Sequence, residues 1–334
     1  MFRAAIPFCL MSAIATASLA QEVNVYSYRQ PELVRPLFDA FTADTGIKVN
    51  VAFLKKGMVE KLVAEGKRSP ADLVLTADIT RLNDVVVAGV VQAVESDVLN
   101  TNIPALYRDP DKQWFGLTTR ARIVFASKSR VADDEVTTYE DLANPRWRGR
   151  ICTRAGTHSY TLALVSAHLA HHSEAVTRKW LQGIKANLAH KPQGNDRAQV
   201  KAVWSGACDI ALGNTYYMGK MLQKPEQVEW AESVRIIFPV FEGAGTHVNV
   251  SGMALTKASH NRDNAVRLME FLSGPEAQSI YARQNFEYPL LEGAEVSELV
   301  ASWGRFTPDD KNLMDLARLR KTSLRLVEEV NFDQ

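Results

Sequence analysis

The sequence predicts an α/β protein with two doubly wound lobes that are joined by two crossing hinge strands. Three observations support this prediction. Strands of buried type alternate with amphipathic helices over residues 23–88, which is the order that produces a parallel sheet. The same alternation returns over residues 149–220. The length of 334 residues exceeds what a single hydrophobic core usually accommodates.

The first lobe is expected to begin with a strand over residues 23–27. A helix follows from Pro31, because Val34, Leu37, Phe38 and Phe41 recur with helical spacing. Gly46 occupies the position at which helices commonly end. The next expected elements are a strand over 47–53, a helix over 57–64, a buried strand over 71–75 and a helix that Asp78 caps and that runs to about residue 88.

Two long extended stretches are expected to connect the lobes. Residues 114–127 could cross to the second lobe, and residues 248–256 could return the chain to the first. We therefore expect lobe one to contain residues 21–120 and 250–334, and lobe two to contain residues 121–249.

The second lobe repeats the pattern of strands and helices. Its expected elements are a strand over 149–153, a helix ending near His172, a helix over 174–186, a helix capped by Asp196 and a strand over 208–212. Helices over 264–272 and 275–283, and one or two helices within 309–330, complete the chain.

The N-terminus has the features of a cleaved secretory signal over residues 1–20. Arg3 precedes a short apolar run, and Ser18-Leu19-Ala20 resembles a cleavage site. No later stretch is apolar enough to span a bilayer, so we expect export without membrane insertion. The formal net charge of +1 falls to zero without Arg3, which gives no electrostatic reason to expect a nucleic-acid partner.

Export also bears on the two cysteines of the mature chain, Cys152 and Cys208. An even count in an exported protein favours a disulfide, which would contribute about 4 kcal/mol in the chain-entropy model. A free buried pair is the alternative.

The most informative stretch is residues 213–220, in which Tyr216 and Tyr217 follow an apolar run and precede a helix. One ring could pack in the core while the other lies at the surface. Alternatively, both hydroxyls point into one cleft. Ligands of open parallel sheets bind beyond the carboxyl ends of the strands. If Cys152 and Cys208 are bonded, their strands are neighbours, and Tyr160 joins the same rim.

Three phenolates would neutralise a trivalent cation, and oxygen ligands suit hard ions. Fe³⁺ is the abundant candidate, since Ca²⁺ and Mg²⁺ favour carboxylates whereas Zn²⁺ favours His or Cys. Carbonate could complete the coordination, with Gln30, Arg29 and Arg120 as donors from the facing lobe. Arg120 could instead form a salt bridge at the lobe junction, and Arg29 could be a structural brace.

Other candidate groups are weaker. His168, His171 and His172 are expected at a solvated helix end, and His247 is expected to form hydrogen bonds at the hinge. The sequence contains no nucleophile motif that would indicate an enzyme.

Several motifs resemble those of the periplasmic ferric-ion-binding proteins of bacterial ABC importers, a type 2 solute-binding family. The resemblance covers residues 21–334 and is most specific in VYSYRQP (25–31), SPADLVLTADI (69–79), QWFGLTTRAR (113–122), THSY (157–160) and GNTYYMGK (213–220). It implies that Tyr160, Tyr216 and Tyr217 bind the iron, and that Gln30 and Arg120 contact a synergistic carbonate. Some members place a His in the first loop, where this chain has Gln30-Pro31, so a fourth protein ligand such as Tyr28 is not expected.

The resemblance implies a periplasmic, monomeric Fe³⁺ carrier that serves an ABC permease and its ATPase at the inner membrane. The alternative is a carrier of an oxyanion or a small organic cation on the same fold. An exported hydrolase is a third hypothesis, and the missing nucleophile motif counts against it.

Overall fold

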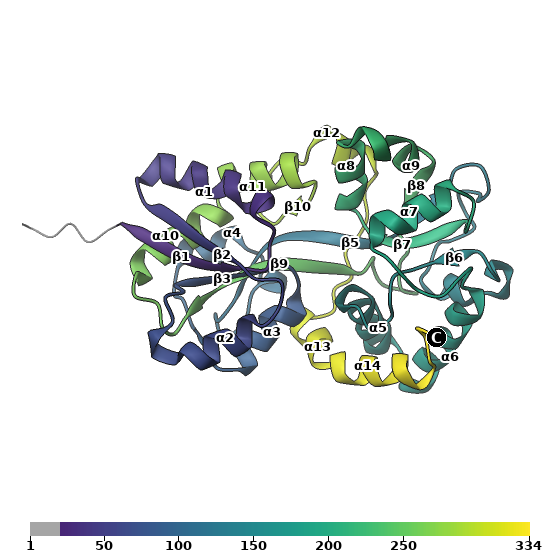
Figure 1. Ribbon diagram of the computed structural model, residues 1–334, viewed down its shortest axis with the longest axis horizontal. Coiled ribbons are helices and arrows are strands. Elements are labelled where there is room, and N and C mark those ends of the chain that lie inside the picture. Colours follow the sequence, from purple (N-terminus) through teal and green to yellow (C-terminus); the bar gives the residue numbers. More distant parts are fainter. Residues whose placement is uncertain (1–20) are drawn as a thin grey trace, which may run out of the picture.

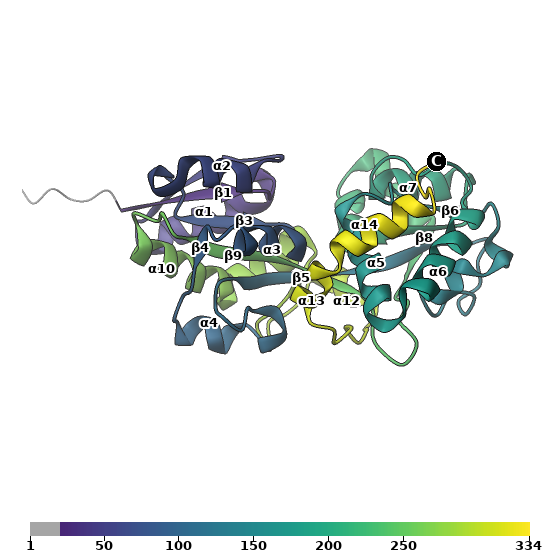
Figure 2. The ribbon, with the colours of Figure 1, turned by 90° about the horizontal axis from the view of Figure 1, so that it is seen from below.

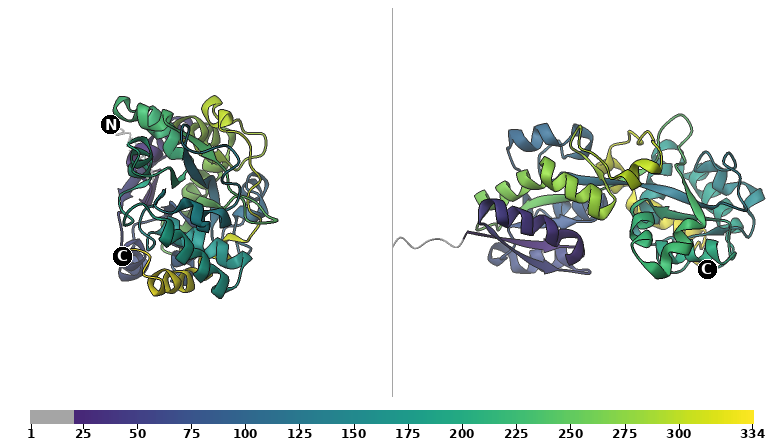
Figure 3. Two further views of the ribbon diagram at one scale, coloured as in Figure 1. Left: turned by 90° about the vertical axis from the view of Figure 1, so that its right-hand side faces the viewer. Right: turned by 90° about the horizontal axis from the view of Figure 1, so that it is seen from above.

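The computed structural model describes residues 21–334, so the expected signal over residues 1–20 lies outside the described residues. Figure 1 shows two lobes side by side, with strands β5 (Phe115–Ser127) and β9 (Val248–Thr256) running between them. The right-hand view of Figure 3 shows the same two bodies from above. The predicted α/β fold, with two lobes and two crossing strands, is confirmed.

In the first lobe, helices cover a sheet whose strands β2, β1 and β3 run parallel. Gly46 ends the first helix with a φ of 72°, in the left-handed region that favours glycine. Asp78 caps the third helix, as predicted, by accepting a hydrogen bond from the Arg81 amide. The elements are β1 (Glu22–Ser27), α1 (Pro31–Thr45), β2 (Lys48–Phe53), α2 (Met58–Glu65), β3 (Leu73–Thr76), α3 (Ile79–Val87), β4 (Val91–Gln92) and α4 (Asp97–Asn102).

Strand β5 belongs to both lobes. Its first half, up to Ala121, pairs antiparallel with β9, whereas residues from Arg122 onward pair antiparallel with β7 (Ile210–Asn214). Strand β9 in turn pairs antiparallel with β3 of the first lobe. The sheets are therefore mixed rather than purely parallel, because the two strands that cross between the lobes run against their neighbours.

In the second lobe, the short strand β6 (Ile151–Cys152) lies parallel to β7. The disulfide between Cys152 and Cys208 is present, with the two Cα atoms 5.9 Å apart, so that prediction is confirmed and the free pair is excluded. The other elements are the short 3-10 helix η3 (Glu140–Ala143), α5 (Ser159–His171), α6 (Glu174–Asn187), α7 (Asp196–Trp204), α8 (Tyr216–Leu222), α9 (Val228–Glu232) and β8 (Val234–Ile237).

The C-terminal segment contains α10 (Arg262–Ser273), α11 (Pro275–Ile280), β10 (Tyr288–Pro289), α12 (Glu298–Ser302), α13 (Leu313–Arg318) and α14 (Arg320–Glu329). Helix α14 lies along the second lobe (Figure 2), where Arg325 pairs with Glu174 and Ser323 hydrogen-bonds to Ser166. We therefore propose that α14 accompanies the second lobe, while the expected boundaries at residues 120 and 250 stay predictions. Within residues 21–334, no helix is both long and apolar enough to cross a membrane.

Candidate metal centre

A cavity of about 700 Å³ opens between the lobes. Residues of the first lobe and of the hinge form one wall, and residues of the second lobe form the other. The lining side chains include Tyr28, Arg29, Gln30 and Arg120 on the first wall and Tyr160, Tyr216 and Tyr217 on the second. Most of them follow the carboxyl end of a strand, which is where open α/β sheets place their ligands.

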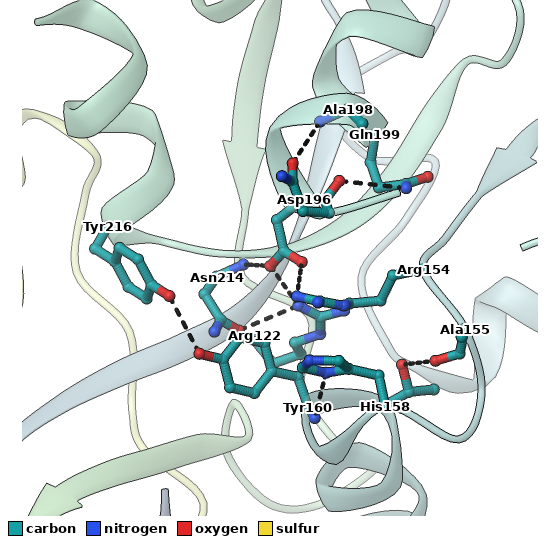
Figure 4. A network of polar contacts seen from close by, with 12 residues as sticks. Arg122, Arg154, Ala155, His158, Tyr160, Asp196, Ala198, Gln199, Asn214 and Tyr216 are labelled. Carbon is teal, nitrogen blue, oxygen red and sulfur yellow. Dashed lines mark hydrogen bonds and ion pairs between the residues drawn. The ribbon is translucent and has the colours of Figure 1, made fainter. Parts of the chain in front are cut away.

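The three predicted phenols lie together on the second wall. The hydroxyl oxygens of Tyr160 and Tyr216 are 3.3 Å apart (Figure 4), and the rings of Tyr216 and Tyr217 lie 4.3 Å apart between centroids. Tyr160 is in the first turn of α5, whereas the other two begin α8. The interpretation with one ring in the core and the other at the surface is therefore wrong, because both rings line the cavity.

Two glycines of the motif let the chain approach its neighbours closely enough for this arrangement. A Cβ atom added to Gly213 would lie 2.2 Å from the Phe125 ring, and one added to Gly219 would lie 2.3 Å from the Phe286 ring. Both contacts are far shorter than van der Waals distance. Any side chain at these positions would displace β7 or α8, and the tyrosines with them.

The environment keeps two of these phenols in their neutral form. Burial raises the pKa of Tyr216 well above its usual range, and the neighbouring Tyr160, Tyr217 and Asp196 add to the effect. Burial, together with the charge of Asp196, raises the pKa of Tyr217 to about 12. Near neutral pH, a cation that binds these oxygens as phenolates must therefore displace protons.

A buried network of charged groups lies beside the phenols (Figure 4). The Asp196 carboxylate accepts hydrogen bonds from Arg122 at 2.7 Å, from Arg154 at 2.8 Å and from the Asn214 amide at 2.9 Å. The Arg154 guanidinium also lies 5.1 Å from the centre of the Tyr160 ring. The network thus links the strand end before the Tyr-Tyr pair to the loop before Tyr160.

This network corrects one prediction. Asp196 does not cap α7, because the cap is Asn195, whose side chain accepts a hydrogen bond from the Ala198 amide. Asp196 is the first residue of the helix, and its carboxylate is fully buried between two arginines. Sequence reasoning missed the roles of Arg122 and Arg154. The spacing of Arg120 and Arg122 on one strand was the available signal, since residues two apart share a face.

On the facing wall, Arg29 and Arg120 differ in how their donors are used. Arg29 forms a two-pronged pair with Glu287, at 2.8 and 3.0 Å, and donates to the Ser251 hydroxyl. Arg120 donates through Nη1 to the same hydroxyl at 2.9 Å, but its Nη2 has no partner among residues 21–334. No salt bridge forms from Arg120 within these residues, so that alternative is excluded. Arg29 is the structural brace.

Glu287 explains why this brace is stable. Burial alone would raise the pKa of its carboxyl group, but the charge and hydrogen bonds of Arg29, together with the charge of Arg120 and the hydrogen bond from Thr118, outweigh burial and lower the pKa. The Glu287 carboxylate also accepts a hydrogen bond from Thr118 at 2.6 Å. A carboxylate and a guanidinium are therefore buried together with their charges compensated.

The remaining residues of the first loop have separate surroundings. Gln30 is exposed and immediately precedes α1, so its side chain can reach the cavity that it lines. The Tyr28 hydroxyl instead accepts a hydrogen bond from the Met58 amide at 2.9 Å, and its ring lies 4.1 Å from the Arg81 guanidinium. Tyr28 is thus held at the start of α2.

The histidine cluster differs from its predicted solvated state. His168 is fully buried and stacks on Trp180, while His172 pairs with Glu140 and His171 with Asp309. Burial, with the neighbouring His172 and His171, lowers the pKa of His168 to about 3. The helical pattern placed these residues at a helix end but did not show that α6 covers that end. His247 is also buried, and its backbone amide donates to the Tyr139 hydroxyl.

Comparisons with known proteins agree with this architecture. Residues 68–311 match the model of a family described as bacterial extracellular solute-binding protein. The chain is 42% identical to "Iron uptake protein A1" of Synechocystis sp., over 93% of this chain and 88% of that protein.

Two solved structures extend the likeness to three dimensions. The apo ferric ion-binding protein A of Pasteurella haemolytica aligns with a TM-score of 0.90 and 49% identity, over 94% of this chain and 99% of that one. A Trichodesmium protein solved in complex with iron and citrate aligns with a TM-score of 0.89 and 37% identity, over 93% and 99% of the two chains.

Proposed function

The chain belongs to the family of bacterial extracellular solute-binding proteins, and from this membership we propose that it binds one ferric ion in the cavity between its lobes. Its relatives are solute-binding transport proteins of iron uptake rather than enzymes, and this chain is not an enzyme. Iron is accordingly its cargo.

The clustering of three phenols on one wall is the observation that supports this proposal most strongly. Tyr160, Tyr216 and Tyr217 come from two helix starts and line the same wall of the cavity. As phenolates they would supply hard oxygen ligands and three negative charges, which balance the charge of Fe³⁺. The bound ion would make their ionisation favourable despite the low-dielectric surroundings.

We propose that a synergistic anion, carbonate in the simplest case, completes the coordination from the facing wall. The unpartnered Nη2 of Arg120 offers a buried charged donor, and Gln30 offers an amide at the cavity edge. The amides at the start of α1 would add to the attraction. Citrate is the competing anion to test, because a related structure contains iron and citrate.

The same proposal covers transport. A carrier of this family would collect iron in the periplasm and deliver it, as a monomer, to a permease and its ATPase at the inner membrane. Release would require the walls to separate, the phenolates to take up protons, or the anion to leave.

Visible spectroscopy tests the assignment. Tyrosinate-to-Fe³⁺ charge transfer should colour the protein orange to red after loading with ferric citrate and bicarbonate. The double variant Tyr216→Phe/Tyr217→Phe should lose this colour, whereas Tyr107→Phe, a ring outside the cavity, should keep it. A wild-type protein that stays colourless, with an iron affinity unchanged in the double variant, would contradict the proposal.

A carrier of an oxyanion is the second candidate, and a specific feature favours considering it. Arg81, Arg197, Lys220 and Lys224 also line the cavity and make it cationic in the absence of phenolates. The same charge disfavours a small organic cation. Calorimetry against phosphate and spermidine, without iron, separates these possibilities from the ferric carrier.

A further inference from the structure

A second group of potential metal ligands lies at the far end of α5. Glu140, His168 and His172 each offer one ligand atom, and these atoms all lie within 4.8 Å of one another. Tyr160 is in the first turn of this helix and His168 near its last, about 12 Å apart along the axis at the usual rise. The group is therefore separate from the cavity between the lobes.

The two histidines lie next to each other where α5 ends. His168 lies in the last turn of α5 and His172 is its C-cap residue, and their ring centres are 4.3 Å apart. Glu140, at the start of η3, faces them, and His172 Nε2 lies 2.8 Å from its Oε1 atom. Side chains from two segments thus meet at one point.

The ring of His168 is held in a fixed position. Its Nδ1 lies 2.9 Å from the Thr177 hydroxyl, and the ring stacks on Trp180 at 4.2 Å between centres. When Nδ1–H donates to the threonine, Nε2 retains a lone pair. A hydrogen bond at one ring nitrogen that leaves the other for a metal is the usual support of histidine ligands.

Two atoms of the group are buried without a partner. His168 Nε2 and Glu140 Oε2 are buried and have no hydrogen-bond partner within residues 21–334. Water cannot take the place of a partner at His168, because its side chain is fully buried. Buried polar atoms are nearly always paired, so two orphans in one group indicate a missing ligand. The C-terminal end of α5 also favours a positive charge here through the helix dipole.

We propose that Glu140, His168 and His172 bind one divalent transition-metal ion of the Zn²⁺ type. Two imidazoles and one carboxylate form a ligand set that suits zinc, with a fourth position for water. Tetrahedral Zn²⁺ needs ligand atoms about 3.4 Å apart, so the distances within the group, which reach at most 4.8 Å, must shorten by up to about 1.4 Å. Glu140 and His172 are partly exposed, which gives the ion a route to the site.

The proposed zinc site and the cavity between the lobes would select different ions. Imidazole nitrogens suit borderline ions such as Zn²⁺, whereas phenolate oxygens suit hard Fe³⁺. Zinc would also tie the segment around Glu140 to the end of the helix whose start bears Tyr160. We therefore expect the zinc site to stabilise the second lobe without being needed for the ferric colour.

Zinc titration calorimetry tests the proposal, with Tyr216→Phe/Tyr217→Phe as the background so that the cavity does not contribute. The background protein should bind one Zn²⁺ per chain. Glu140→Gln and His172→Gln should each lower the affinity at least tenfold, and both are partly exposed, so the core stays filled. His260→Gln, at an exposed histidine, is the matched control and should leave affinity unchanged.

Two further measurements make the result decisive. X-ray absorption of the zinc-loaded protein should show nitrogen ligands, and zinc should raise the thermal midpoint of the background protein but not that of His172→Gln. Zinc affinities equal in Glu140→Gln, His172→Gln and the background, or no binding at about 100 μM Zn²⁺, would overturn the proposal. Neither result would affect the ferric site, which is read from its colour.

Discussion

A buried group of charged residues positions the segments that carry the phenols of the cavity. Asp196 is buried between Arg122 and Arg154, and it fixes Asn214 just before the Tyr-Tyr pair. The same carboxylate disfavours a second negative charge nearby and so helps to keep Tyr217 protonated. A cation is therefore needed before the phenols ionise.

The raised pKa values of Tyr216 and Tyr217 predict how iron binding depends on pH. Both phenols are protonated below those values and would release their protons to bind Fe³⁺, so affinity should fall as pH falls. Tyr160 also gives up one proton when it binds as a phenolate, so three protons in all correspond to about 1000-fold in apparent affinity per pH unit. Competition with citrate, corrected for the protonation of citrate, measures this slope between about pH 8 and about pH 6.

Tyr217→Phe serves as the control for that slope. Removing one phenol should reduce the proton dependence by one, to about 100-fold per pH unit from Tyr160 and Tyr216. An affinity that does not change with pH would mean that these phenols do not bind the metal as phenolates.

Substitutions of Arg120 and Arg29 should affect different properties, iron binding and stability respectively, although both residues line the cavity. Arg120→Gln should abolish the bicarbonate dependence of iron binding and lower affinity at least about tenfold, because it removes the charged donor with an unused nitrogen. Arg29→Gln should instead destabilise the fold by about 3–5 kcal/mol, because it leaves the Glu287 carboxylate buried and unpaired. Ferric titration and urea unfolding of both variants measure the two effects.

Arg262→Gln, at an exposed residue, is the control for both measurements. If Arg120→Gln binds iron with the same bicarbonate dependence as the wild type, the anion is not held by Arg120.

At the scale of elements, the relation between β6 and β7 determines where the phenols meet. The two strands run parallel, and each leads into a segment that bears a tyrosine of the cavity. The Cys152–Cys208 disulfide joins the same two segments, and both cysteines are buried. The backbone hydrogen bonds between β6 and β7 and the Cys152–Cys208 disulfide therefore hold the two strands in the same relative position.

Replacing both cysteines by serine predicts a loss of about 4 kcal/mol in the free energy of unfolding, the value of the chain-entropy model for a loop of this length. The disulfide constrains the unfolded chain, so the effect should appear as a lower urea midpoint. The reduced wild-type protein should unfold at the same concentration as the variant. An unchanged midpoint in both would show that the bridge adds no stability.

The ferric colour of the serine variant distinguishes stability from site geometry. We expect the colour to persist without urea, because β6 and β7 remain paired through their backbones. Its loss would mean that the ladder alone does not align Tyr160 with Tyr216.

At the scale of the whole molecule, the cavity has walls that belong to different lobes, and β5 and β9 run from one lobe to the other. The C-terminal helices add a third connection between the lobes. Helix α13 packs against α3 of the first lobe, and α14, which follows it directly, hydrogen-bonds to α5 of the second lobe. A ligand bound to both walls would stabilise their approach, because each wall then gains contacts that it lacks alone.

Loading with Fe³⁺ and bicarbonate therefore predicts a smaller radius of gyration in solution. Small-angle X-ray scattering of the metal-free and loaded protein measures the change. Tyr216→Phe/Tyr217→Phe, treated in the same way, should show no contraction. An identical radius in the metal-free and loaded wild type would mean that the ion does not draw the walls together.

The local sequence pattern was sufficient to predict much of the fold of this protein. Spacings of a few residues predict the alternation of strands and helices, the end of α1 at Gly46 and the strand-to-helix junction at the Tyr-Tyr pair. Such spacings act locally, so they do not depend on distant segments. The disulfide followed from the even cysteine count, given export. These features determined the fold class and predicted side chains that line one cavity between the lobes.

The tertiary structure decided what depends on partners distant in sequence. It gave Asp196 two arginines instead of a cap, gave Arg29 a carboxylate but left Arg120 with an unused donor, and covered His168 with α6. It also made β5 change partners midway and placed α14 on the second lobe. Burial and charge pairing depend on contacts between segments that are distant in sequence. Helical or strand periodicity does not specify those contacts, because it describes only one segment at a time.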